Sequence, residues 1–443
     1  MATKPQIRFR GHQDSWEEKK LGEIGEFKSN GVNKKISPDE IPVNLLNYMD
    51  VYKKRYITAN NCSELMQVTA KERQLRENDV KEGDIFFTPS SETPDDIGHV
   101  KVIEEDLPNT VYSYHLMRFR KNEDSKLDKI YPEYALETDF VRKQMFLAAQ
   151  GAQRFVISKP AFEQLSMMVP SPAEQEKIGD FFKTLDELIG AKEEELEKLR
   201  QLKQALLQQM FPAKDEEEFA GGGISQIINS LDGNTFTISA APNTPRIRFK
   251  GFTEPWELCN ISSKAKFSKG KGYSKSDLTE SGNLIILYGM LYTNYNTFIY
   301  DSKQHASMKN GSVVSEGCEV VIPASGETAE DIARASAILK SGIIIGGDLN
   351  IIRPNDTIEP GFLALELTYG KSHKELVKKA QGISVVHLHN SDIEELDIML
   401  PSIEEQQKIS AFFHSQDTQI NAAQEQITKL RTIKQALLQK MFA

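Results

Sequence analysis

The sequence predicts two α/β (α+β) domains in tandem duplication, joined by two long antiparallel coiled-coil helices and related by a pseudo-two-fold axis. The chain of 443 residues is long enough to bury several cores. Its opening segment Pro5–Gly11 returns as Pro245–Gly251, at an offset of 245 − 5 = 240. The segment Pro170–Phe211 aligns without a gap on Pro401–Phe442, at an offset of 401 − 170 = 231. A repeat of this length indicates one ancestral unit written twice.

Shorter matches between these landmarks follow the same order in both halves. The offset drifts by a few residues at a time, which loop insertions and deletions would cause. The matches are Trp16-Glu17 with Trp256-Glu257, Tyr48 and Tyr52 with Tyr288 and Tyr292, Glu82-Gly83 with Glu316-Gly317, Glu92-Thr93 with Glu327-Thr328, and Ala149-Gln150-Gly151 with Ala380-Gln381-Gly382.

The repeat divides the chain into five segments. We expect a first domain at 1–169, a first helix at 170–211, a linker at 212–244, a second domain at 245–400 and a second helix at 401–443. Each domain mixes apolar strand-like runs with shorter helical patterns and turn clusters, which favours a mixed fold. The linker is first acidic and then rich in glycine, with Gly221–Gly223 as its most flexible point.

Both long helices begin at a Pro-Ser pair followed by acidic residues, which is a helix-start signal. Apolar residues then recur at 4,3 spacing, which predicts a coiled-coil seam; an amphipathic helix lying on its own domain is the alternative. The seam includes the polar residues Lys192, Lys203, Gln416 and Lys434, which indicate either a fixed register or a face left for a third helix. Its apolar members are Ile178, Phe182, Leu185, Ile189, Leu196, Leu199 and Leu206, then Ile409, Phe413, Ile420, Ile427, Leu430 and Leu437.

The linker decides the direction of the pair. A random coil of its length spans about 30 Å, whereas each helix is about 55–60 Å long. A parallel pair would require the linker to return along a full helix, so the antiparallel arrangement is expected.

Composition and cysteine content exclude several classes of protein. The cysteines Cys62, Cys259 and Cys318 are isolated, so we expect neither a disulfide framework nor a structural zinc site. Such cysteine usage favours a cytoplasmic location. No apolar run is long enough to cross a membrane. The net charge of −10 excludes a protein coated in basic surface but allows a local basic face.

No catalytic motif is present in the sequence. Gly270-Lys271-Gly272 lacks the first glycine and the Ser/Thr of a phosphate-binding loop. An Asn/Asp-Pro-Pro-Tyr/Phe motif for base methylation is missing too. His387 and His389 alternate in a strand-like run, where packing or surface exposure is favoured over a metal site. We expect no catalytic residue and no metal ligand.

Basic loops occur at corresponding places in the two halves and differ in sequence. We expect them to bind phosphates, with a solvated lysine-rich loop as the alternative. Ser91 and Ser325 lie in repeated small polar loops, where a turn is slightly favoured over close approach to a bound ligand. The basic candidates are Lys34, Lys35, Lys53, Lys54 and Arg55 in the first half, and Lys264, Lys266, Lys269, Lys271 and Lys275, in a segment expected to be flexible, in the second.

The chain resembles the specificity subunit of a Type I restriction-modification enzyme. The resemblance covers essentially the whole sequence and rests on the helix openings Pro-Ser-x-x-Glu-Gln-x-x-Ile, the domain openings at Trp16 and Trp256, and Glu82-Gly83-Asp84-Ile85. The second half departs from the pattern at Ile261-Ser262, and Cys318 stands where the aspartate of the Gly-Asp pair is expected.

This resemblance implies a non-catalytic, sequence-specific DNA-binding subunit. Its two target recognition domains, 1–169 and 245–400, would each recognise one part of a bipartite double-stranded target, with the spacer helices as a ruler. Two methyltransferase (modification) subunits with S-adenosylmethionine, and motor-nuclease (restriction) subunits with ATP, would be the partners. The chain itself would bind no cofactor. A duplicated coiled-coil adaptor or regulatory protein that binds no DNA is the alternative.

Overall fold

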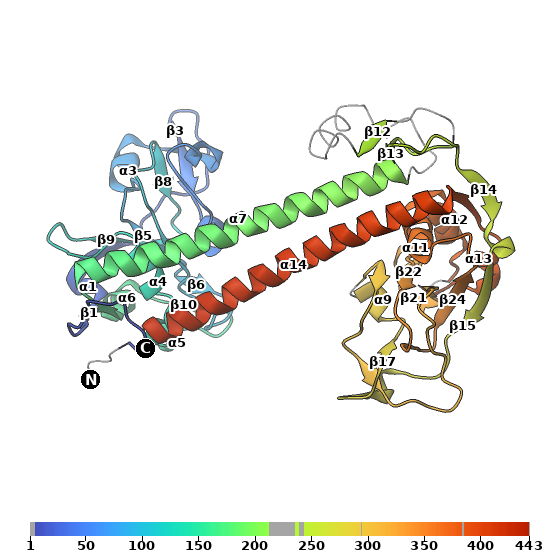
Figure 1. Ribbon diagram of the computed structural model, residues 1–443. Coiled ribbons are helices and arrows are strands. Elements are labelled where there is room, and N and C mark those ends of the chain that lie inside the picture. The colour runs from blue at the N-terminus through green and yellow to red at the C-terminus, as the bar shows by residue number, and fades with distance from the viewer. Residues whose placement is uncertain (1–4, 212–234, 239–242, 294, 383–384, 443) are drawn as a thin grey trace. The chain divides into compact units, whose positions relative to one another are not determined.

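The computed structural model describes residues 5–211, 235–238, 243–293, 295–382 and 385–442 (Figure 1). The chain forms two compact units. Unit 1 consists of Met1–Glu193 with Glu425–Ala443, and unit 2 consists of Glu194–Gln424. Two long helices, α7 (Pro172–Met210) and α14 (Ile403–Met441), are each divided between the units, so that one part of each helix belongs to unit 1 and the other part to unit 2. Each unit is described by itself.

Unit 1 contains an antiparallel sheet with the strand order β2-β9-β5-β7, a mixed sheet with the order β4-β3-β8, and the ribbons β1-β11 and β10-β6. All of its strand pairs are antiparallel except β3 with β8. Besides the long helices, its elements are β1 Glu17–Lys20, α1 Leu21–Ile24, β2 Gly25–Lys28, β3 Ile41–Leu46, α2 Tyr48–Tyr52, η1 Cys62–Glu64, β4 Met66–Ala70, α3 Glu72–Glu77, β5 Ile85–Phe87, β6 Ser90–Ser91, β7 Val100–Val102, β8 Thr110–Tyr112, β9 Met117–Lys121, α4 Tyr131–Ala135, α5 Asp139–Ala148, β10 Phe155–Val156, α6 Lys159–Gln164 and β11 Ser166–Val169.

Unit 2 repeats this plan with the sheets β15-β24-β20-β22-β18 and β16-β19-β17-β23, and the ribbons β14-β26, β21-β25 and β12-β13. Its elements are β12 Phe236–Ile238, β13 Ile247–Phe249, β14 Glu257–Asn260, η2 Ile261–Ser263, β15 Ala265–Lys269, η3 Lys275–Asp277, β16 Leu278–Thr279, β17 Asn283–Ile286, α9 Met290–Thr293, β18 Phe298–Ile299, β19 His305–Ala306, β20 Glu319–Pro323, β21 Ser325–Gly326, α10 Ala329–Ile332, β22 Ser336–Ile338, β23 Ile344–Ile345, β24 Leu349–Pro354, α11 Pro360–Tyr369, α12 Lys371–Lys379, β25 Val386–His387, α13 Asn390–Glu394 and β26 Asp397–Leu400.

The predicted tandem α+β fold with two long helices is confirmed. Most of the predicted linker lies outside the described residues. Its described part contains strand β12, which the composition did not predict and which pairs with β13. Phe236 of β12 is buried and packs against Phe249 at a ring-centroid distance of 4.6 Å. Aromatic burial therefore orders this part of the linker on unit 2.

The ends of the long helices belong to the cores of the units. In unit 1, Ile178 and Phe182 of α7 are buried with Met441 and Phe442 at the end of α14. In unit 2 the corresponding cluster joins residues near the end of α7 to residues near the start of α14, namely Leu206, Leu207, Met210, Phe211, Ile409 and Phe413. The apolar seam residues predicted from spacing are all buried or half-buried.

Each unit contains two polar contacts between α7 and α14, and these contacts establish the antiparallel direction of the helices. In unit 1, Lys434 Nζ lies 2.5 Å from Asp186 Oδ1, and Arg431 donates to Glu193 over 2.6 Å. In unit 2, Lys203 pairs with Asp417, and Arg200 donates to Gln424 over 3.0 Å. The contacts correspond under the repeat offset of 231. Asp186 corresponds to Asp417 (186 + 231 = 417), and Lys203 corresponds to Lys434 (203 + 231 = 434). The two polar seam lysines thus form the same contact in both units.

A buried arginine–glutamate pair fixes the start of each long helix. Arg8 donates to both carboxylate oxygens of Glu174 over 2.6 and 2.8 Å, and Arg248 donates to both of Glu405 over 2.7 Å. The carboxylates are completely buried, and the side chain of Arg248 is only 4% exposed. Bidentate pairing is the strong, directional form of this interaction. The repeated Ile-Arg-Phe segment is therefore held against the repeated Glu-Gln segment.

The glutamines that follow these glutamates also have a structural role. The amide of Gln175 donates to the carbonyl of Pro170 over 2.9 Å, and its oxygen accepts from the N–H of Asp128 at the same distance. Gln406 makes the corresponding contacts with Pro401 and Glu359, both at 2.9 Å. Each glutamine thus joins the first turn of a long helix to the loop that precedes α4 or α11.

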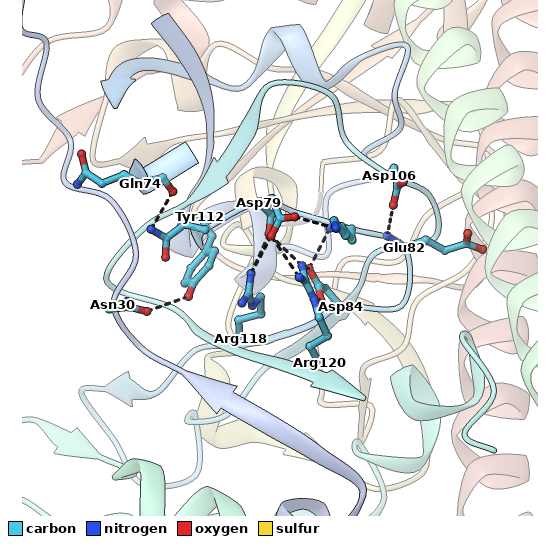
Figure 2. A network of polar contacts seen from close by, with 11 residues as sticks. Asn30, Gln74, Asp79, Glu82, Asp84, Asp106, Tyr112, Arg118 and Arg120 are labelled. Carbon is cyan, nitrogen blue, oxygen red and sulfur yellow. Dashed lines mark hydrogen bonds and ion pairs between the residues drawn. The ribbon is translucent and has the colours of Figure 1, made fainter. Parts of the chain in front are cut away.

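The prediction that Cys318 takes the place of an aspartate is wrong. Asp84, immediately before β5, accepts two hydrogen bonds of 2.6 Å from Arg120 and lies in a polar network with Asp79 and Arg118 (Figure 2). In unit 2 the completely buried Glu319, not Cys318, lies 3.3 Å from Arg353. Ile85 pairs with Phe119, and Val320 pairs with Ile352, so Asp84 corresponds to Glu319. One additional residue, Cys318, therefore separates Gly317 from the residue that corresponds to Asp84.

We expect Glu405→Ala to destabilise unit 2 by about 3–5 kcal/mol, because it leaves the guanidinium of Arg248 buried without its carboxylate. Thermal unfolding monitored by circular dichroism measures the effect. Replacing both partners by methionine should recover much of the loss, and alanine at exposed Glu77, which pairs with Arg73, should change nothing measurable. A single variant as stable as the unchanged chain would contradict this role.

We expect Glu366→Gln to stabilise the chain increasingly as the pH rises. Burial raises the pKa of Glu366 to about 8 from its ordinary value of 4.5, and its Oε1 has no hydrogen-bond partner in the described part of the chain. Between these values the unfolded carboxyl ionises and the folded one stays protonated, so folding loses up to about 5 kcal/mol. The melting temperatures of the variant and the unchanged chain should nearly coincide at about pH 4 and diverge by about pH 8. A constant difference would contradict the buried ionisation.

Candidate nucleic-acid interface

The loop between β2 and β3 presents Lys34 and Lys35 to solvent. The loop is anchored at its start by the N–H of Val32, which donates to the carbonyl of Tyr112 over 2.8 Å. Val32 is buried in a small cluster with strands β3, β4 and β8. The anchor fixes the base of the loop, and both lysines remain exposed.

The other basic group of the first half is already paired within the protein. Lys54 lies 3.0 Å from Glu137, and Arg55 lies 3.1 Å from Glu64 and 3.5 Å from Asp50. The carboxylates of Glu137 and Glu133 and a hydrogen bond to Glu137 together raise the pKa of Lys54, against the lowering effect of burial. Lys53 is exposed. These pairs reduce the positive charge that this segment presents to a polyanion.

The structure brings together a basic and aromatic surface that the sequence indicated only in part. Arg154, in the exposed loop before β10, donates to the hydroxyl of Ser90 over 3.1 Å, and Tyr48 of α2 donates to the Ser90 carbonyl over 2.9 Å. Partial burial lowers the pKa of His115, and so do the positive charges of Lys34 and Arg154. The N–H of Tyr114 donates to the carbonyl of Val32 over 3.2 Å, so the segment of His115 lies beside the start of the loop that carries Lys34. We call Lys34, Tyr48, Ser90, His115 and Arg154 the unit 1 surface.

An exposed aromatic ring extends this surface. Tyr114 is 46% exposed, and its ring centroid lies 3.9 Å from that of His115. Tyr48 stacks on Tyr52 at 5.9 Å. Cations interleaved with aromatic faces suit phosphates and exposed bases. Lys34 and the repeated Tyr48 and Tyr52 were the sequence signals for this surface. Arg154 and His115 were missed because they are isolated in sequence.

The prediction of a flexible cationic segment in the second half is wrong for Ala265–Lys269. These residues form β15, an edge strand that pairs with β24 along its whole length. Lys266 and Lys269 are exposed on opposite faces because side chains alternate along a strand. Alternation also prevents the two lysines from forming a single patch.

The remaining lysines of this segment lie at its ends. Lys264 is half-buried at the end of η2, whereas Lys271 is exposed in the loop beyond β15 and Lys275 is exposed at the start of η3. Lys309 lies over the ring of Tyr273 at 4.7 Å and pairs with Asp277 at 2.5 Å. The basic groups of unit 2 are therefore spread along an edge.

The serines Ser91 and Ser325 lie on two-stranded ribbons. Ser91 of β6 is 6% exposed and pairs with Phe155 of β10, and its hydroxyl donates to the carbonyl of Thr93. Ser325 of β21 pairs with His387 of β25. The ring planes of His387 and His389 are nearly parallel, with centroids 6.5 Å apart. The Ser91 hydroxyl closes the turn that follows β6.

The described residues contain one set of acidic and cysteine side chains close enough to share a metal ion: Glu316, Cys318 and Glu319. The Glu319 carboxylate already accepts from the N–H groups of Glu316, Gly317 and Cys318 at 2.8–3.2 Å. It also contacts Arg353. These bonds fully explain the carboxylate as a structural link between β20 and β24.

Within the described ranges, the search for a helix both long enough and apolar enough to cross a membrane finds none.

A family model of the Type I restriction modification DNA specificity domain matches residues 13–201 and 253–432. The Type I restriction enzyme MjaIX specificity subunit of Methanocaldococcus jannaschii is 22% identical over 449 residues, covering 96% of this chain and 92% of that protein. The MjaVIII specificity subunit of the same organism is 24% identical over 189 residues, covering 43% of this chain. The matches to the MjaX and MjaVIII subunits span 46% and 42% of those proteins, less than half of each.

A solved structure has the same fold. The crystal structure of the Type I restriction-modification system S subunit from M. genitalium covers all of this chain and 99% of its own, with a TM-score of 0.60 and 14% identity.

Proposed function

Because the chain belongs to the family of Type I restriction-modification specificity subunits, with two DNA specificity domains, we propose that it selects the DNA sequence on which a larger enzyme acts. Unit 1 binds one half of a bipartite target in double-stranded DNA, and unit 2 binds the other half. The chain is the non-catalytic recognition component. A coiled-coil adaptor that binds no DNA is not favoured, because the matched domains are DNA specificity domains.

The observation that carries this proposal is a repeated framework with different surfaces. The Arg–Glu pair, the Gln contacts and the ion pairs between helices recur in both units. The exposed residues do not recur: Arg154 and His115 give unit 1 a compact basic surface, whereas the lysines of unit 2 follow an edge strand. Retained architecture with altered surface chemistry suits recognition of two different half-sites.

Other subunits supply the chemistry in this proposal. Two methyltransferase subunits with S-adenosylmethionine modify the target, and motor-nuclease subunits with ATP cut DNA that lacks the modification. The specificity subunit brings neither cofactor and works in the cytoplasm. The long helices set the unread spacer between the half-sites.

Exchange of one domain tests the proposal. Replacing Trp256–Leu400 by the corresponding domain of another family member should change one half-site of the methylated sequence and leave the other intact. Methylation mapping of DNA exposed to the assembled complex measures both halves at once. A change in both halves, or none in either, would contradict independent recognition.

Matched insertions into the helices should lengthen the spacer. Seven residues added to α7 between Glu193 and Arg200, with seven added to α14 between Gln424 and Arg431, keep the flanking contacts in register. Because seven helical residues add about 10 Å, we expect about three extra base pairs between unchanged half-sites. Insertion into α7 alone is the control and should reduce activity. An unchanged spacer with the matched insertions would contradict the ruler.

A further inference from the structure

The repeated Ala-Gln-Gly sequence closes a tight hairpin in each unit. The N–H of Gln150 donates to the carbonyl of Val156 over 3.0 Å, and the reverse bond is 2.9 Å. Gln381 and His387 exchange the corresponding pair of bonds at 3.0 and 2.8 Å. The recognition proposal gives this motif no role.

Glycine is required at the same place in both hairpins. Gly151 has φ +148°, and a Cβ there would lie 2.0 Å from the carbonyl oxygen of Arg154. Gly382 has φ +153°, and its Cβ would lie 1.9 Å from the carbonyl oxygen of Val385. Only glycine allows this close approach without strain. The hairpins therefore bring corresponding residues to corresponding positions, since 154 + 231 = 385.

The strands beside the hairpins are also repeated. β10 pairs with β6, so the unit 1 hairpin lies beside Ser90 and, through its carbonyl, beside Tyr48. β25 pairs with β21 in unit 2. Tyr288 and Tyr292, which correspond to Tyr48 and Tyr52, again lie close together, with ring centroids 6.1 Å apart. The same supporting framework presents both hairpins.

The residue presented by this framework differs in chemistry between the units. Arg154 is exposed, donates one hydrogen bond to Ser90, and has no carboxylate within ion-pair distance among the described residues. It belongs to the basic unit 1 surface with Lys34 and His115. Val385 is 49% exposed. The corresponding positions therefore present a cation in unit 1 and an apolar side chain in unit 2.

We propose that positions 154 and 385 determine base specificity, with Arg154 recognising a guanine in one half-site and Val385 contacting a thymine methyl group in the other. A guanidinium can donate two hydrogen bonds to O6 and N7 of guanine in the major groove, and apolar side chains favour the C5-methyl of thymine. The bond to Ser90 holds the guanidinium in a defined orientation before DNA binds. This inference rests on the proposed DNA recognition and names the contacts that provide it.

Selection of bound sequences from a pool of randomised duplex DNA tests the inference, using the full chain assembled with methyltransferase subunits. Arg154→Val should reduce the preference for guanine at one position of one half-site by about 10- to 100-fold. The other half-site should stay unchanged. Val385→Arg should create a guanine preference at one position of the second half-site. Equal melting temperatures of the variants and the unchanged chain show that the fold is retained.

Lys34→Ala is the matched control, since a phosphate contact weakens binding to all sequences alike and flattens the salt dependence. If Arg154→Val had that same uniform effect, or left every base preference unchanged, position 154 would not determine specificity. Such a result would leave the proposed function intact, because the unchanged chain would still select a sequence. If the unchanged complex selected no sequence at all, the recognition proposal would fail together with this inference.

Discussion

The buried pairs Arg8–Glu174 and Arg248–Glu405 constrain the rest of the structure. Each pair joins the repeated opening segment of a half, Pro5–Gly11 or Pro245–Gly251, to the first turn of its long helix, across more than 150 residues of sequence (174 − 8 = 166 and 405 − 248 = 157). A buried ion pair needs both partners and their geometry, because either charge left alone is costly. The direction in which each helix leaves its domain is thereby fixed.

Once the helices start in fixed directions, each unit requires residues from both halves of the chain. Phe442, at the end of α14, contacts Trp16 in unit 1 at a centroid distance of 5.8 Å, and Phe211, at the end of α7, contacts Trp256 in unit 2 at 6.2 Å. The duplicated halves are therefore not independent folding domains. Removing the last turn of either helix would open a core as well as shorten a coiled coil.

The repeats are not identical at these sites, and the differences show what the framework tolerates. Trp16 donates its indole N–H to Glu174 over 3.1 Å, whereas the buried indole N–H of Trp256 has no partner among the residues that the structure describes. Asp84 in unit 1 is replaced by the longer Glu319, yet both carboxylates meet an arginine on the neighbouring strand. The framework thus conserves the charge pairing and allows the side-chain length to vary. Exposed positions such as Arg154 and Val385 carry no such restriction.

The sequence by itself determined the duplication, the two long helices and their antiparallel direction, because these depend on local periodicity and on the length of a linker. It also indicated the Arg and Glu-Gln motifs, although not that they meet. Only the tertiary structure decided that Glu319 takes the place of Asp84, since strand register depends on pairing with β9 or β24 and not on spacing along the chain. The same holds for the unit 1 surface: Lys34, Ser90, His115 and Arg154 are far apart in sequence, and only the packing of strands and loops brings their segments together.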